Sequence, residues 1–293
     1  MPKTDFFDID FSNDKALSPE ERREWNDIYA SYRAKSLLTG RVVGVDELHL
    51  QARNPNSGLL EDRTIRCLVV LDYRVKVLIP ETEVWFDQNT QVSDNVLRNM
   101  PGAMVDYVIR EVDREGECAL ASRRLALDRR QRTFRNKLHI REGDKVTCQA
   151  LAIGPTKMLV TCHGFDRALA QHSISHGMIL DLREDYHSGD VYEAIFQGFQ
   201  EDGSIRLSIR DAKPHPFDGA DNRPPVHSRR VARITGKYAG GVHCALEKEL
   251  DCLCLYSPEQ RDSEFDPGDW VIIVVSRMDY ARKKVYGIIV GKR

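Results

Sequence analysis

One pattern occurs three times along the chain, namely a β-rich run that ends in a short polar turn. The three copies are VLIPETEVW (77–85), ALAQHSISH (168–176) and CLCLYSPEQ (252–260). After each copy come a glycine, a β-rich run, a charged turn and a second β-rich run, which is typical of a β-hairpin. A repeated unit of this kind limits the fold strongly, because each copy has to form the same small structure.

Two further strands are predicted before each turn. The first of them begins with a basic opener, which reads GRVVGV (40–45), GDKVTCQALAI (143–153) or SRRVARITG (228–236). In the first unit a long polar insert, residues 46–63, separates the two strands. Five short strands suit a small closed Greek-key barrel of the OB type, which leaves no free sheet edge. A single larger β domain with accidental internal similarity is the alternative.

The chain is therefore predicted to be mostly β, with three tandem five-stranded OB-type barrels, an N-terminal helix and a connecting Arg-rich helix. The predicted boundaries are 1–37 for an acidic leader and amphipathic helix, 38–124 for the first barrel with its insert, 125–141 for the Arg-rich helix, 142–212 for the second barrel, 213–227 for a Pro/Gly linker and 228–293 for the third barrel. The linker composition excludes a helix or a central strand and favours independent movement of the third barrel.

The units resemble the S-one RNA-binding domain, a repeat of the largest small-subunit ribosomal protein and of several ribonucleases. The resemblance rests on a turn after strand three, a glycine that opens strand four, an Asp-containing hairpin and an Ile-x-Leu-Ser closing strand. The matching residues are Pro80, Gly102, Asp113 and LASRR (120–124) in the first unit, Gln171, Ser173, Gly189, Asp190 and IRLSI (205–209) in the second, and Leu255, Ser257, Gly268, Asp269 and Asp279 in the third. It covers residues 38–293, and no unit carries the whole motif.

The resemblance implies binding of single-stranded RNA, because family members stack bases on exposed aromatic residues of strands two and three. Such stacking contributes about 1–3 kcal/mol per base. The first two units lack these aromatic residues, whereas the third places Tyr238 and His243 on the exposed face of strand two. The predicted site in the third barrel comprises Arg233, Lys237, Tyr238, His243, Arg282, Lys283 and Lys284. A purely structural place for Tyr238 and His243 is the alternative.

The segment 122–137 is rich in arginine and contains neither glycine nor proline, which favours a helix between the first two barrels. One hypothesis is a stripe that binds phosphates, since each cation–phosphate contact adds a salt-dependent increment to affinity. Its members are Arg123, Arg124, Arg129, Arg130, Arg132 and Arg135. An equally supported interpretation is a solvated connecting helix whose arginines pair with acids of the barrels.

A helix start is predicted at Ser18, with Pro19 as the first helical residue and Glu21 completing a capping box. The apolar residues that follow recur every three or four positions and form one face, comprising Trp25, Ile28, Tyr29 and Tyr32. We expect this face to pack on the first barrel, with docking to a partner protein as the alternative. The Phe/Asp-rich leader before it is either a docking tail or a disordered end.

The remaining features of the 293-residue chain suggest an intracellular protein without a catalytic motif. No apolar run approaches the roughly 18 residues of a membrane span, and no secretory signal is found. The seven cysteines include no C-x-x-C pair, which favours a reducing, cytoplasmic location. His172, His176 and His187 lack the glutamate of a zinc-protease motif, so no metal or other cofactor is predicted.

Together these patterns predict a non-catalytic protein that binds single-stranded RNA, or another nucleic acid, through tandem S-one-like barrels. From residue 223 onward 13 Lys and Arg stand against 9 Asp and Glu, so basic charge and aromatic residues coincide in the third unit. The alternative is a structural or adaptor protein of a larger assembly, such as a ribosome-, polymerase- or virion-associated particle. Its partner would dock on the N-terminal segment and the first two barrels. The near-neutral net charge of −2 favours this second hypothesis.

Overall fold

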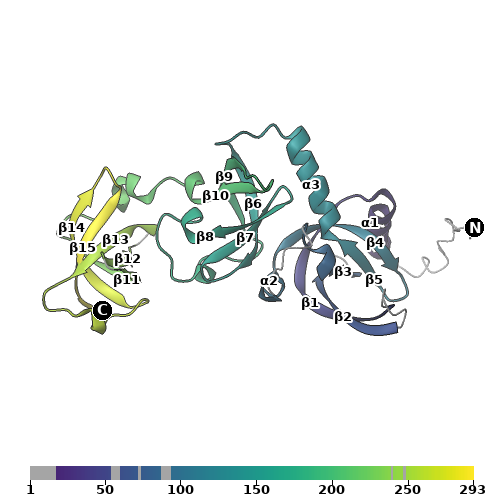
Figure 1. Ribbon diagram of the computed structural model, residues 1–293, viewed down its shortest axis with the longest axis horizontal. Coiled ribbons are helices and arrows are strands. Elements are labelled where there is room, and N and C mark those ends of the chain that lie inside the picture. Colours follow the sequence, from purple (N-terminus) through teal and green to yellow (C-terminus); the bar gives the residue numbers. More distant parts are fainter. Residues whose placement is uncertain (1–17, 54–59, 72–73, 87–93, 239, 247–248) are drawn as a thin grey trace, which may run out of the picture. The chain divides into compact units, whose positions relative to one another are not determined.

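Three five-stranded sheets follow one another along the chain (Figure 1). The computed structural model describes residues 18–53, 60–71, 74–86, 94–238, 240–246 and 249–293. The chain divides into two compact units between Arg130 and Gln131, with one sheet in the first unit and two in the second. The predicted mostly β architecture with three five-stranded sheets is therefore found.

The first sheet is a closed barrel with the strand order β1-β2-β3-β5-β4. Its strands are β1 (Leu38–Arg53), β2 (Leu60–Val70), β3 (Lys76–Pro80), β4 (Met104–Asp113) and β5 (Cys118–Ser122). The strand β4 closes the barrel by pairing with β1, and β3 lies parallel to β5. The short helix α2 (Asp94–Arg98) precedes β4 and is anchored by the buried Leu97.

The insert of the first unit does not separate β1 from β2 as a loop. Instead it lengthens both strands, and they pair in register from Gly44 opposite Val69 to Arg53 opposite Leu60. Backbone pairing satisfies the donors and acceptors of the insert despite its polar side chains, so the two strands are longer than the sequence predicts. The remaining insert residues, 54–59, lie outside the described part of the chain.

The helix α1 (Pro19–Ala34) begins at the predicted capping box. The Ser18 side chain accepts from the amide of Glu21 at 3.2 Å, and the Glu21 carboxylate accepts from the amide of Ser18 at 2.7 Å. Ile28 is fully buried, and the hydroxyl of the buried Ser31 accepts from the amide of Ile109 in β4 at 3.2 Å. The helix thus packs on the first barrel as predicted, although Tyr32 is largely exposed. The leader, residues 1–17, lies outside the described residues.

The second sheet has the order β10-β9-β6-β7-β8 and is open between β8 and β10. Its strands are β6 (Lys145–Ile153), β7 (Lys157–Cys162), β8 (Phe165–Ala170), β9 (Val191–Phe199) and β10 (Ile205–Ser208). The prediction of a fully closed barrel is therefore wrong here. The strand β10 has only four residues, and its pairing with β9 is interrupted by a bulge, so too little backbone remains to pair with β8.

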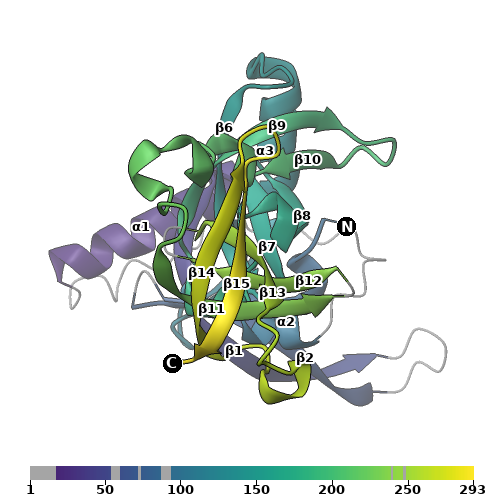
Figure 2. The same ribbon diagram turned by 90° about the vertical axis from the view of Figure 1, so that its left-hand side faces the viewer.

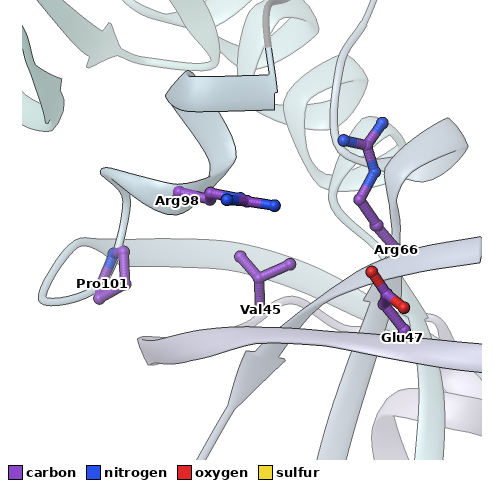
Figure 3. A pocket seen from close by; sticks show the side chains of 5 residues that line it. All are labelled: Val45, Glu47, Arg66, Arg98 and Pro101. Atoms are coloured by element: carbon purple, nitrogen blue, oxygen red, sulfur yellow. The ribbon is translucent and has the colours of Figure 1, made fainter.

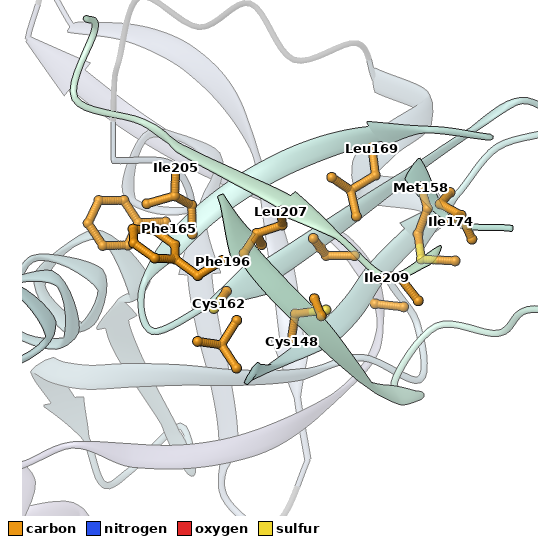
Figure 4. Packing of buried hydrophobic residues seen from close by; sticks show 14 of the residues in the cluster. Cys148, Met158, Cys162, Phe165, Leu169, Ile174, Phe196, Ile205, Leu207 and Ile209 are labelled. Carbon is orange, nitrogen blue, oxygen red and sulfur yellow. The ribbon is translucent and has the colours of Figure 1, made fainter. Parts of the chain in front are cut away.

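Side chains from every second strand position fill the interior of the second sheet. Along β6, Val146, Cys148 and Ala150 point inward and are buried, while the intervening residues face outward. The same core takes in Met158 and Phe196 from neighbouring strands (Figure 4). This period of two is the pattern of strands with one buried face, which explains why the sequence alone predicted the strands well.

The third sheet is again a closed barrel, with the order β11-β12-β13-β15-β14. Its strands are β11 (Arg229–Tyr238), β12 (Gly241–Ala245), β13 (Asp251–Tyr256), β14 (Trp270–Asp279) and β15 (Lys284–Lys292). Figure 2 shows the β14–β15 hairpin, with its turn and the C-terminus at opposite ends. The strand β13 lies parallel to β15, as β3 does to β5 in the first barrel.

The Pro/Gly linker is packed against the third barrel. It forms two short 3-10 helices, Pro216–Asp218 and Ala220–Asn222, and the buried Phe217 joins the core of the third barrel. Asp218 pairs with Lys283 of the β14–β15 turn at 2.6 Å. The composition correctly excluded a long helix or strand, but this packing argues against free movement of the third barrel about the linker.

Candidate nucleic-acid interface

Tyr238 and His243 meet on the outside of the third barrel. Their ring centroids lie 5.3 Å apart and the rings stand at 88°, so the edge of one faces the other. The Tyr238 side chain is 55% exposed. The prediction that both lie on strand two is wrong, because Tyr238 is the last residue of β11 and only His243 lies on β12. They meet because β11 and β12 are paired neighbours.

The ring of Tyr238 is held in place by its surroundings. A Cβ atom on Gly236 would lie 2.8 Å from Cε2 of Tyr238, so the ring lies against the bare backbone of this glycine. Its hydroxyl donates to Sδ of Met178 at 3.7 Å, and Nδ1 of His243 lies 2.8 Å from a carboxylate oxygen of Asp251. An exposed aromatic ring with a fixed orientation suits stacking, because little conformational entropy remains to be lost.

The two predicted cations on β11 both have acidic partners. Arg233 pairs with Glu184 at 2.6 Å, and this hydrogen bond lowers the pKa of the Glu184 carboxyl. Lys237 donates to the backbone oxygen of Asp262 at 2.6 Å and lies 3.2 Å from its carboxylate. The Tyr256 hydroxyl, followed by Lys237, lowers the pKa of Asp262. Exposed pairs of this kind contribute only about 0–1 kcal/mol each, so a phosphate can compete for the cations.

The predicted cations of the β14–β15 turn lie away from Tyr238. Register fixes their place, since Arg229 at the start of β11 pairs with Val274, and the turn at 280–283 extends beyond that end of β11. Tyr238 stands at the other end of the same strand. The expectation that the turn rims the face of Tyr238 is therefore wrong. Lys283 is paired with Asp218, whereas the side chains of Arg282 and Lys284 make no ion pair with a described residue.

The predicted Arg-rich helix is present as α3 (Arg123–Lys137), and its first turns face the first barrel. Arg123 is only 1% exposed, and its Nη1 donates to the backbone oxygen of Val84 at 2.9 Å. Arg124 pairs with Glu83 at 2.9 Å and Arg130 with Asp106 at 2.7 Å, while Arg129 donates to the backbone oxygen of Lys35. A phosphate role for Arg123 is incompatible with this burial.

The last turns of α3 face the second sheet. Phe134 is buried among aromatic rings, and Arg135 lies over the ring of Phe165 at 5.4 Å while donating to the backbone oxygen of Gly203 at 3.2 Å. Arg132 is exposed but also has an intramolecular interaction. None of the six arginines is thus without a partner, which favours the connecting-helix interpretation, and the phosphate stripe stays a prediction.

Several apolar residues of the third barrel are exposed, which the sequence did not predict. Leu255 is 63% exposed and Ile288, its register partner on β15, is 39% exposed, so the two form an aliphatic patch on the outer face. Trp270, at the start of β14, is also largely exposed. A signal was available for Trp270, since it comes two residues after Gly268, the glycine that opens strand four.

The residues considered for metal or nucleophilic chemistry do not form a site. The described residues hold no group of three or more His, Cys, Asp and Glu that could bind a metal ion. All seven cysteines are unpaired, and burial raises the pKa of the Cys67 thiol to about 11 and that of Cys148 to about 12. In the described part of the chain no helix is long and apolar enough to cross a membrane.

His176 instead lies against a second histidine, His215 of the linker, with ring centroids 4.5 Å apart. Burial lowers the pKa of His215 below its usual 6.5, and His176, Lys283 and Arg210 act in the same direction against the opposing effect of Asp218. His215 therefore binds a proton less readily in the folded protein than in the unfolded chain. The contribution of neutral His215 to the free energy of unfolding is present above pH 6.5 and is lost as the pH falls below it.

We expect the free energy of unfolding to decrease between pH 7.5 and pH 5, partly because of His215. In His215→Asn the decrease should be smaller, since asparagine does not titrate and its side-chain oxygen can still accept from the amide of Phe217, as Nδ1 of His215 does. Urea unfolding across this pH range measures the effect. An equal decrease in both proteins would show that His215 is not responsible.

No protein-family model and no curated protein matches the sequence. Among solved structures, the chain is similar to a multidomain protein with nucleic acid binding domains from Streptococcus pneumoniae TIGR4, at 10% identity over 87% of this chain and 73% of that chain, with a TM-score of 0.21. It is also similar to Drosophila Unr CSD456, at 15% identity over 88% of this chain and 98% of that chain, with a TM-score of 0.18. Values this low do not establish a shared overall structure or activity, so the candidate interface rests on its own geometry.

Proposed function

We propose that the protein is a non-catalytic binder of single-stranded nucleic acid and that its ligand is RNA. The observation that carries the proposal is the exposed ring of Tyr238, which is held in a fixed orientation by Gly236 and His243 on an OB-like barrel. In OB folds the face of strands two and three and the adjoining loops bind oligonucleotides. Tyr238 lies where the first strand passes into the second, at the border of that face.

The proposed contact is a base stacked on Tyr238 with its phosphate next to Lys237. Lys237 would exchange its exposed partner Asp262 for the phosphate, at little cost in free energy. The choice of RNA, and of S-one-like domains as the family, rests on the sequence resemblance described above. A reducing, cytoplasmic location is also proposed, in keeping with the seven unpaired cysteines.

An adaptor role is the second candidate, and the aliphatic patch of Leu255 and Ile288 favours it. Exposed aliphatic side chains offer no stacking surface to a base but suit an apolar surface of a protein partner. The partnered arginines of α3 also agree with this role. The two functions differ in their dependence on salt, because protein docking on an aliphatic patch releases few counterions.

The test is a titration of the full chain with a labelled single-stranded RNA of about 12 nucleotides at several salt concentrations. We expect binding that weakens with salt, and in Lys237→Gln a salt slope that is flatter by about 0.7, corresponding to one lost phosphate contact. The triple variant Arg129→Gln, Arg130→Gln and Arg132→Gln serves as the control. It removes three positive charges on α3, outside the third barrel, and should leave the slope unchanged.

Absence of binding even at low salt would contradict the proposal and leave the adaptor role. Equal binding of single-stranded DNA of the same sequence would retain nucleic-acid binding but remove the preference for RNA. A flatter slope in the triple variant would restore the phosphate stripe on α3.

A further inference from the structure

A pocket of about 320 Å³ lies on the first barrel (Figure 3). Val45 and Glu47 of β1 form its floor, and Arg66 of β2 stands at one side. Arg98, at the end of α2, and Pro101 complete the lining. Its volume is at the lower end of the range found for pockets that bind small molecules.

The pocket contains two opposite charges that are not paired with each other. Glu47 and Arg98 are both exposed, and neither makes an ion pair or a side-chain hydrogen bond with another described residue. Arg66, by contrast, is bound by two hydrogen bonds of 3.1 Å to Glu81. In Figure 3 the guanidinium of Arg98 extends above Val45, and the carboxylate of Glu47 is turned toward the same space.

The segment that carries Arg98 is fixed to the barrel. Leu97 and Met100, on either side of Arg98, are 3% and 0% exposed. Just after Pro101, the amide of Gly102 donates to the backbone oxygen of Val42 at 2.7 Å. The backbone on both sides of the pocket is therefore anchored. Because it is already ordered, little backbone conformational entropy is lost when a ligand binds.

We propose that this pocket binds a single guanine base. A ligand that satisfies both charges has to offer donors to Glu47 and acceptors to Arg98, and a single planar ring above Val45 can offer both. Guanine presents O6 and N7 as acceptors for a guanidinium and its ring N–H and exocyclic amine as donors for a carboxylate. Uracil offers one donor, and adenine and cytosine each offer one amino group, so each makes fewer of these contacts.

This inference relies on the proposed function for the source of the base, which would be a guanosine of the bound single strand. The first barrel would then contribute a preference for guanosine in the RNA sequence, while Tyr238 would stack on any base. The two sites can be tested separately, because a mononucleotide occupies the pocket without a strand that reaches the third barrel.

The experiment follows the methyl NMR signals of Val45 in the full chain during titration with guanosine 5′-monophosphate and, separately, with uridine 5′-monophosphate. We expect guanosine monophosphate to shift these signals and to bind roughly tenfold more tightly, as expected for the loss of one bidentate contact. Glu47→Gln and Arg98→Gln should each abolish the difference between the two nucleotides. Arg110→Gln and Glu111→Gln, which change the same charges on exposed residues of β4, should leave it intact.

Equal shifts with both nucleotides, or a preference that survives Glu47→Gln, would overturn the inference. If the RNA titration succeeds while guanosine monophosphate leaves Val45 unaffected, the pocket fails and the proposed function stands. If guanosine monophosphate binds while no RNA does, the pocket stands and single-strand binding by the third barrel fails.

Discussion

Phe134→Ala is expected to lower the free energy of unfolding by about 3–5 kcal/mol, the usual cost of removing a buried phenylalanine. Phe134 is 3% exposed, and its ring centroid lies 5.5 Å from that of Phe165 and 5.6 Å from that of Phe196, edge to face in both cases. Through this ring, the C-terminal end of α3 packs against the core of the second sheet. Because this sheet is not closed by pairing of β8 with β10, we expect it to depend strongly on the inserted side chain.

Urea unfolding followed by circular dichroism measures this loss, with Leu138→Ala as the matched control. Leu138 follows α3 directly but is 38% exposed, so its truncation should cost less than about 1 kcal/mol. If Phe134→Ala were no more destabilising than the control, α3 would not be part of the folded second unit.

Tyr238→Ala is expected to weaken RNA binding by about 1–3 kcal/mol, which corresponds to roughly 5- to 150-fold in Kd. The stacking surface is lost, while the fold should be retained because the side chain is 55% exposed. His243→Ala should have a smaller effect, since His243 meets the ring edge-on and positions it. The double variant should then bind about as weakly as Tyr238→Ala alone, because a positioning residue contributes nothing once the ring is gone.

Gly236→Ala tests the same arrangement without removing an aromatic residue. The added Cβ would lie 2.8 Å from the tyrosine ring and displace it, so binding should weaken although Tyr238 is present. Tyr32→Ala, at an exposed tyrosine of α1, is the control that should bind as tightly as the parent protein. Additive losses in the double variant would indicate that His243 stacks on a base of its own.

The strands were predictable because their signal is local. Buried residues alternate along β6, and Gly189 and Gly268 adopt positive φ angles of 95° and 102° shortly before β9 and β14, a conformation that favours glycine. The capping box of Ser18 and Glu21 is equally local, since its two hydrogen bonds join residues three positions apart.

The candidate site was predictable only in part. Tyr238 and His243 meet on the surface of the third barrel, but the strand that carries Tyr238 depends on where the turn before β12 begins. Such boundaries are the least reliable part of a sequence prediction. The pocket between Glu47 and Arg98 left no signal, because these two residues come from segments about 50 positions apart.

By itself, the sequence determined α1, α3, most of the strands and the succession of three five-stranded units. Only the tertiary structure decided which cations remain available to a ligand. Arg123 is buried and donates to the backbone oxygen of Val84, Arg130 is paired with Asp106, and Lys283 is paired with Asp218. None of these partners is close in sequence. The physical reason is that strand periodicity is a property of neighbouring residues, whereas the partner of a long charged side chain is set by whichever distant segment folding brings within about 4 Å.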